Sequence, residues 1–184
     1  AWPDGRVVFE GLSFRISGPE RLAVLGPNGA GKTTLIRLAT GQLSPTTGEV
    51  RRQVPFALLD QRAALLADDQ TVLENFRRLN PGASVNDAHA ALARFLFRNA
   101  AALQVAGTLS GGERLRAALA CVLCAATPPQ LLILDEPTNH LDLDSVRAIE
   151  AALAGYDGAL LVVSHDQDFL EAIGVDRRIA LKTP

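Results

Sequence analysis

The chain of 184 residues has no methionine and only two cysteines. With no initiator residue present, we expect a domain or processed fragment of a longer gene product. Cys121 and Cys124 have C-x-x-C spacing, but no second cysteine pair or nearby histidine completes a metal site. They lie in an Ala/Leu-rich stretch with a helical pattern, so we expect both to pack in the core or against a helix. A reducing, cytoplasmic compartment fits this cysteine usage.

Charge of one sign and long apolar runs are also missing. The net charge of −2 gives no sign of a nucleic-acid-binding surface. No apolar run is as long as the roughly 18 residues that a membrane-spanning helix needs, and no secretory signal is visible. A hydrophobic content of 48% with 21% charged residues is typical of a soluble globular domain with a sizeable core.

The segment 26–33 reads G-P-N-G-A-G-K-T, which is the G-x-x-x-x-G-K-T pattern of a phosphate-binding P-loop. Its glycines permit backbone angles that turn successive N–H groups into one concave anion site. Lys32 adds positive charge for the β- and γ-phosphates, and the hydroxyl of Thr33 suits Mg²⁺. The candidate nucleotide-binding residues of this segment are Asn28, Gly29, Ala30, Gly31, Lys32, Thr33 and Thr34.

Short apolar runs alternate with helical patterns along the chain, which predicts a parallel sheet covered on both faces. Expected strands are 21–25, 56–59, 131–134 and 159–163, with extended segments at 7–16 and 49–51. Expected helices are 34–40, 71–97 with a break at Pro81-Gly82, a helix from Ser110, 145–153 and 168–173. The predicted fold class is α/β: a P-loop NTPase with a mainly parallel sheet flanked by helices, an antiparallel amino-terminal portion and a small α-helical subdomain.

Acidic residues follow the apolar run 131–134. Asp135 closes that strand, so its carboxylate is expected at the carboxyl edge of the sheet, where open α/β sheets bind ligands. Together with Thr33 it would hold Mg²⁺, directly or through water. Glu136 points elsewhere and is placed to orient and deprotonate an attacking water. His165 ends the last apolar strand by the same reasoning.

The order of these motifs resembles the ATP-binding cassette (ABC) ATPases along essentially the whole chain. L-S-G-G-E at 109–113 matches the signature, L-L-I-L-D-E-P at 131–137 the Walker B segment, and V-S-H-D at 163–166 the switch histidine. T-N-H-L-D at 138–142 resembles the ABC-F branch, whose members are soluble tandem-cassette ATPases, many acting on ribosomes. The resemblance implies that the chain is one cassette, the carboxyl-terminal one of a tandem pair.

By this resemblance, residues 1–61 and 109–184 form the catalytic core. Residues 62–108 form a helical subdomain that leads to the signature.

Several roles rest on the resemblance alone. His165 would contact the γ-phosphate, and Gln61 would be the Q-loop residue that touches Mg²⁺ or the lytic water. Trp2 would stack on adenine, and His140 would be an interface residue rather than a metal ligand. The implied catalytic set is Glu136, His165, Gln61 and Lys32, and the implied metal ligands are Thr33, Asp135 and Gln61.

The signature residues Ser110, Gly111 and Gly112 begin a helix, and a helix N-terminus is a natural anion site. The resemblance implies that this anion is the γ-phosphate of an ATP held by an opposite cassette. Two cassettes would therefore pair head to tail, as a homodimer or with the missing half of a tandem chain. The ribosome is the further partner that the ABC-F branch suggests.

The expected function is ATP binding and Mg²⁺-dependent hydrolysis to ADP and phosphate, in an ABC-F protein acting on ribosomes and translation. The alternative is the ATP-hydrolysing subunit of a membrane transporter, which T-N-H-L-D and the short stretch between Gln61 and Ser110 disfavour. A nucleotide switch without catalysis is disfavoured by the intact Lys32, Asp135, Glu136 and His165. Chromosome-maintenance ATPases would need long heptad stretches, and the sequence has none.

Overall fold

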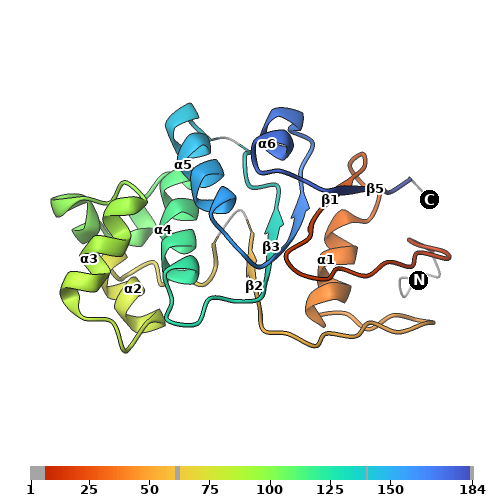
Figure 1. The fold of residues 1–184 in the computed structure, drawn as a ribbon, viewed down its shortest axis with the longest axis horizontal. Coiled ribbons are helices and arrows are strands. Elements are labelled where there is room, and N and C mark those ends of the chain that lie inside the picture. The colour runs from red at the N-terminus through yellow and green to blue at the C-terminus, as the bar shows by residue number, and fades with distance from the viewer. Residues whose placement is uncertain (1–6, 61–62, 140, 183–184) are drawn as a thin grey trace.

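The computed structural model describes residues 7–60, 63–139 and 141–182. Trp2, Gln61 and His140 lie outside this part of the chain. The described residues build one sheet of five parallel strands in the order β2-β3-β4-β1-β5 (Figure 1). The strands are β1 Arg21–Leu25, β2 Phe56–Leu59, β3 Leu131–Asp135, β4 Ala159–Val163 and β5 Arg177–Ala180.

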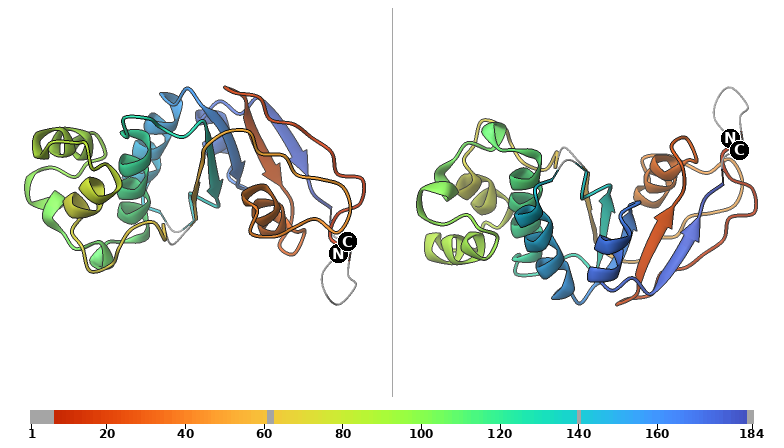
Figure 2. Two further views of the ribbon diagram at one scale, coloured as in Figure 1. Left: turned by 90° about the horizontal axis from the view of Figure 1, so that it is seen from below. Right: turned by 90° about the horizontal axis from the view of Figure 1, so that it is seen from above.

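Helices cover both faces of this sheet (Figure 2). Helix α1 packs on one face, where alternate strand residues such as Val24 and Ile133 share a core with Leu35 and Ile36. The remaining strand residues point to a larger core built with α4, α5 and α6. The α-helices are α1 Lys32–Thr40, α2 Val72–Leu79, α3 Val85–Arg94, α4 Gly111–Leu123, α5 Leu143–Ala154 and α6 Gln167–Ala172.

Beyond the β2 edge of the sheet, α2 and α3 pack together beside α4, with two 3₁₀ turns at Asn99–Leu103 and Ala106–Thr108 (Figure 1). Capping boxes begin α2, α3 and α4, in which the side chain of a Thr or Ser and that of an acidic residue three positions later satisfy each other's backbone donors. The predicted break at Pro81-Gly82 separates α2 from α3. No helix in the described ranges is long and apolar enough to cross a membrane.

Two sequence predictions differ from the structure, and one strand of the structure was not predicted. Residues 7–16 form no strand, so the expected antiparallel amino-terminal portion is not found in the described part of the chain. Their alternation reflects partial burial, because Phe14 and Ile16 pack against the core without pairing in a ladder. Residues 49–51 also form no strand, and Val50 is exposed. Strand β5 was missed, because an exposed edge strand carrying two arginines lacks an apolar run.

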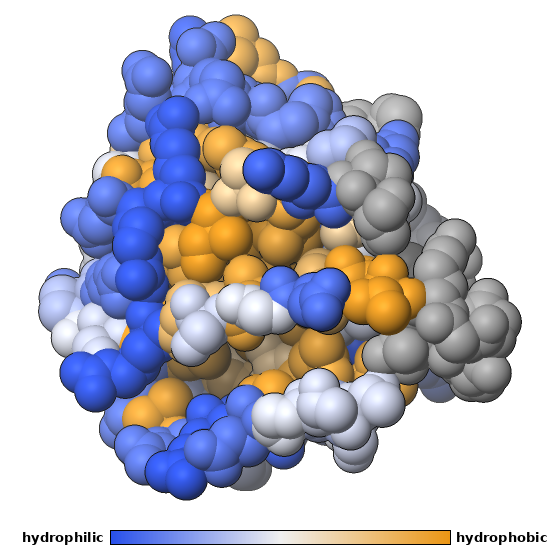
Figure 3. Space-filling model, turned by 90° about the vertical axis from the view of Figure 1, so that its right-hand side faces the viewer, coloured by the Kyte–Doolittle hydropathy of each residue, from blue (hydrophilic) through white to orange (hydrophobic). Residues whose placement is uncertain are grey.

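The face of the molecule beside β5 has an apolar centre bordered by hydrophilic side chains (Figure 3). Phe9, Phe14, Ile16 and Ile179 contribute to this end of the core and are only partly buried. Residues 7–16 are held beside β5 by the guanidinium of Arg177, which donates to the carbonyl of Arg15. Residues 7–16 by themselves therefore cover the end of the core near β5 only in part.

Candidate functional site

The carboxyl ends of four strands bring the predicted chemistry to one edge of the sheet. Strand β1 leads into the P-loop, β2 into Asp60, β3 into Glu136 and β4 into His165. The strand order places β4 between β3 and β1, so the acidic pair and the P-loop lie on either side of it. Parallel strands make this convergence unavoidable, because all their carboxyl ends face the same way.

The P-loop has the backbone that its glycines allow. Gly29 and Gly31 have φ values of 83° and 95°, in the left-handed region that other residues rarely adopt. A Cβ on Gly31 would also lie 2.8 Å from Cζ of Phe9, so the loop passes too close to the amino-terminal segment for a side chain. Helix α1 then begins without a side-chain cap, which leaves the first-turn amides available to an anion.

Lys32, Glu136 and His165 form a contact cluster beside the P-loop. The ammonium of Lys32 donates to the carbonyl of Gly26 at 2.8 Å and lies 3.8 Å from Oε1 of Glu136. The other carboxylate oxygen, Oε2, lies 3.0 Å from Nδ1 of His165. The side chains of Lys32 and Glu136 are mostly buried, whereas that of His165 is 72% exposed. Three residues chosen from separate motifs thus lie in one group.

Glu136 has a backbone conformation that the sequence did not reveal. Its φ is +50°, which for a residue with a side chain costs about 1–2 kcal/mol. Its amide donates to the carbonyl of Val163 at 2.8 Å, which extends the pairing of β3 with β4 by one residue. Strained residues of this kind cluster at functional sites, and this one carries the carboxylate that contacts Lys32 and His165.

Asp135 and Thr33 offer oxygen atoms of the kind that Mg²⁺ prefers. Burial raises the pKa of Asp135, the carboxylates of Glu136 and Asp60 raise it further, and the Lys32 ammonium lowers it. The described residues contain no group of three or more His, Cys, Asp or Glu that could cage a metal. This donor set fits Mg²⁺ bound by one carboxylate and a hydroxyl together with substrate phosphates, as is usual for that ion.

Helix α4 carries the second predicted anion site away from the first. Ser110 caps this helix. Its Oγ accepts from the amide of Glu113 at 3.3 Å, and the Glu113 carboxylate accepts from the amide of Ser110 at 2.9 Å. Ser110 and Gly111 are exposed, whereas Gly112 is buried. Helices α4 and α1 lie apart in all views, with strands between them (Figures 1 and 2). The two anion sites of one chain therefore do not meet.

A sequence profile described as ABC transporter matches residues 9–139, which is more than half of the chain. The chain belongs to the ATP-binding cassette family. It is 41% identical over 176 residues to the ATP-binding protein Uup of Caulobacter vibrioides, and 40% identical over 164 residues to the putative ATP-binding protein YdiF of Bacillus subtilis. These matches cover 91% and 88% of this chain but only 28% and 25% of the relatives, so it spans about a quarter of their length.

Two solved structures share the fold of this ABC domain. One is titled as a dimeric, post-hydrolysis state of the ATP-binding cassette MJ0796 bound to ADP and Pi. Its TM-score is 0.79 at 24% identity, over 96% of this chain and 87% of that one. The other is a bacterial Atm1-family ABC exporter with ATP bound, with a TM-score of 0.81 at 24% identity, over 100% of this chain and 36% of that one. The Uup-type relatives are ABC-F proteins, and this chain is an ATP-binding ABC domain of that type.

The two glycines of the ABC signature have different surroundings, which predicts different effects of a methyl group. A Cβ on Gly112 would lie 2.6 Å from Oγ and 2.8 Å from Cβ of Ser145, whereas one on Gly111 would meet open space. We expect Gly112→Ala to lower the free energy of unfolding by about 1–3 kcal/mol through overpacking. Gly111→Ala is the matched control and should unfold like the wild type. Urea denaturation measures both, and equal stability of the two variants would contradict the packing seen here.

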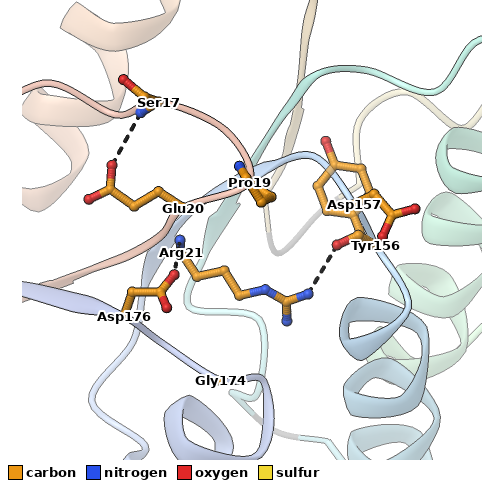
Figure 4. Close-up of a pocket in the computed structure, with 8 residues that line it drawn as sticks. All are labelled: Ser17, Pro19, Glu20, Arg21, Tyr156, Asp157, Gly174 and Asp176. Atoms are coloured by element: carbon orange, nitrogen blue, oxygen red, sulfur yellow. Dashed lines mark hydrogen bonds between the residues drawn. The ribbon is translucent and has the colours of Figure 1, made fainter.

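A surface hollow of about 510 Å³ lies at the opposite edge of the sheet, before the strands begin (Figure 4). Arg21 crosses it and donates to the carbonyl of Tyr156 at 3.0 Å, and its own amide donates to Asp176 at 2.8 Å. Glu20 accepts from the amide of Ser17 at 3.1 Å. These charged groups are engaged within the fold, so we assign this hollow no part in nucleotide chemistry.

Sequence reasoning missed one residue that the edge of the sheet brings near the site. Asp60 directly follows β2 and contributes to the raised pKa of Asp135. The same rule that singled out Asp135, an acidic residue at the carboxyl end of a buried strand, could have found it. The predictions for Trp2 and Gln61 stay predictions, because both residues lie outside the described part.

Proposed function

We propose that this ABC domain hydrolyses ATP to ADP and phosphate with the help of Mg²⁺, and that Glu136 is its general base. The cluster of Lys32, Glu136 and His165 carries the proposal. In this cluster an ammonium, a carboxylate and an imidazole lie together beside the P-loop. Phosphoryl transfer needs mainly positioning and charge neutralisation, and these groups supply both.

The contacts in the structure suggest what each side chain does when ATP binds. The ammonium of Lys32 would exchange the carbonyl of Gly26 for phosphate oxygens, while the amides from Gly29 to Thr34 surround the β-phosphate. Glu136 would accept a proton from the attacking water. His165, already 3.0 Å from that carboxylate, would hold it in position and contact the γ-phosphate. Thr33 and Asp135 would hold Mg²⁺, which neutralises charge on the β- and γ-phosphates.

We also propose that the working unit is a head-to-tail pair of cassettes. The separation of α4 from the P-loop supports this, since the signature residues of one chain lie apart from its own P-loop (Figures 1 and 2). A second copy of this chain, or another cassette of the parental protein, would supply the missing half of each site. The cassette core would then be residues 1–61 and 109–184, with 62–108 as the helical subdomain.

We propose a role in translation, with the ribosome as a partner and the cytoplasm as the location, because the relatives of this chain are ABC-F proteins. They also disfavour the transporter subunit as the alternative. We propose further that this is the carboxyl-terminal cassette. Sedimentation of the parental protein with bacterial ribosomes in the presence of ATP tests the ribosomal role, and a parental chain that never pellets with ribosomes would remove it.

The ATPase proposal predicts Mg²⁺-dependent phosphate release that rises faster than in proportion to protein concentration, because each site would need two chains. A coupled phosphate assay with light scattering on the same samples measures turnover and pairing together. Chelation by EDTA should stop the reaction. Turnover that persists without a divalent ion, or none above buffer at any concentration, would contradict the proposal.

A further inference from the structure

Arg116 is a buried charge on the signature helix that the proposed mechanism does not use. Its residue is only 8% exposed, and no carboxylate in the described ranges forms an ion pair with it. Burying a guanidinium in this way is costly unless its donors are satisfied. The groups that satisfy them therefore indicate what the residue holds in place.

The guanidinium of Arg116 joins three elements. Nη1 donates to the carbonyl of Phe95, the C-cap residue of α3, at 2.9 Å. Nε donates to Oγ of Ser145 at 3.3 Å, in the first turn of α5. The group also lies 5.2 Å from the ring centroid of Phe97, within reach of a cation–π interaction. One side chain thus ties the signature helix to the helical subdomain and to α5.

Ser145 continues the connection to the segment that follows the acidic pair. Its amide and its hydroxyl both donate to the carboxylate of Asp142, at 2.8 Å and 2.9 Å. The Asp142 carboxyl has a lowered pKa because of these bonds, with a smaller contribution from the charge of Arg116. Asp142 caps α5. Gly112 packs directly on Ser145, one helical turn before Arg116 on the same face of α4.

We propose that Arg116 is a positioning residue that fixes the start of the signature helix against the start of α5. The exposed start of the helix, at Ser110 and Gly111, then meets the ATP of the opposite cassette in a set orientation. This inference rests on the proposed head-to-tail pairing. It separates two steps: Arg116 governs how well the pair closes, while ATP binding by the P-loop of the same chain, on the far side of the sheet, does not depend on it.

The test uses variants in a Glu136→Gln background, where pairs are expected to persist. Arg116→Gln removes the charge and most of the N–H donors of the guanidinium. Arg116→Lys keeps the charge but cannot serve Phe95 and Ser145 together. Arg98→Gln is the matched control, because Arg98 is an exposed arginine of the helical subdomain. ATP affinity is measured by calorimetry, ATP-dependent pairing by light scattering, and folding by thermal unfolding.

For Arg116→Gln we expect unchanged ATP affinity and a loss of about tenfold or more in pairing affinity, the scale of a lost hydrogen bond from a charged donor. Arg116→Lys should be intermediate, and Arg98→Gln should pair like the parent. A parallel fall in ATP affinity, or full pairing with only a lower unfolding temperature, would reduce Arg116 to a structural residue and overturn the proposal.

Ser145→Ala keeps the inference testable if the arginine variants do not fold. It removes the hydroxyl link and leaves the packing against Gly112, so pairing should weaken in the same direction with ATP affinity kept. The double variant with Arg116→Gln should pair no worse than Arg116→Gln alone, because the two groups act through one contact. Unchanged pairing in Ser145→Ala would overturn the inference. A parent that binds ATP but never pairs would remove the head-to-tail arrangement itself, and the role of Arg116 with it.

Discussion

Glu136→Gln is expected to nearly stop ATP hydrolysis while ATP still binds. The amide keeps the size of the side chain but cannot accept the proton of the attacking water, a contribution typically worth about 10²–10⁴-fold in rate. It also removes the carboxylate that lies 3.8 Å from the Lys32 ammonium, so ATP meets less competition for that charge. We therefore expect ATP affinity to be kept or increased.

The same variant should accumulate ATP-dependent pairs, because the step that separates the cassettes is blocked. Steady-state phosphate release measures the first effect and light scattering with ATP the second. Glu171→Gln is the matched control, since Glu171 is exposed on α6 and the chemical change is identical. Wild-type turnover in Glu136→Gln would remove Glu136 from the role of general base.

Lys32→Ala is expected to weaken Mg-ATP binding by about ten- to hundredfold, the value of a charged hydrogen bond lost without replacement. The ammonium now rests on the carbonyl of Gly26 and near Glu136, and both contacts are local, so the fold should survive the change. Without it, the carboxylate of Glu136 would lose its ammonium neighbour and would repel the phosphates more strongly.

Lys182 provides the control for this variant, because it is the other lysine of the chain and is exposed beyond β5. Isothermal titration of Lys32→Ala and Lys182→Ala with Mg-ATP separates a local role from a general effect of lost charge. Equal affinity in the two variants would refute a phosphate-binding role for Lys32.

Much of the fold could be predicted because its local signals agree with its tertiary environment. The runs at 131–134 and 159–163 are apolar throughout since both faces of their strands are buried, and the structure places them in the middle of the sheet. Ser110 and Glu113 predicted the start of α4, because a capping box depends only on residues close in sequence. Strand β5 gave no such signal, because its neighbours on the sheet, rather than its own side chains, determine its conformation.

The sequence predicted that several candidate site residues lie at one edge of the sheet, but not how their side chains contact one another. Because the carboxyl ends of parallel strands meet at one edge of the sheet, the sequence predicted that Lys32, Asp135, Glu136 and His165 lie near one another. The left-handed backbone of Glu136 depends on the carbonyl of Val163, which lies far away in the sequence. The buried contacts of Arg116 likewise join three separate segments. No spacing along the chain carries that information.

The central claim is that the P-loop amides and Lys32 bind the phosphates of Mg-ATP. Isothermal titration of the wild-type chain, with folding verified by circular dichroism, tests it most directly. The account predicts saturable binding of one nucleotide per chain that weakens when Mg²⁺ is chelated. A well-folded chain that takes up no Mg-ATP up to millimolar concentration would contradict it.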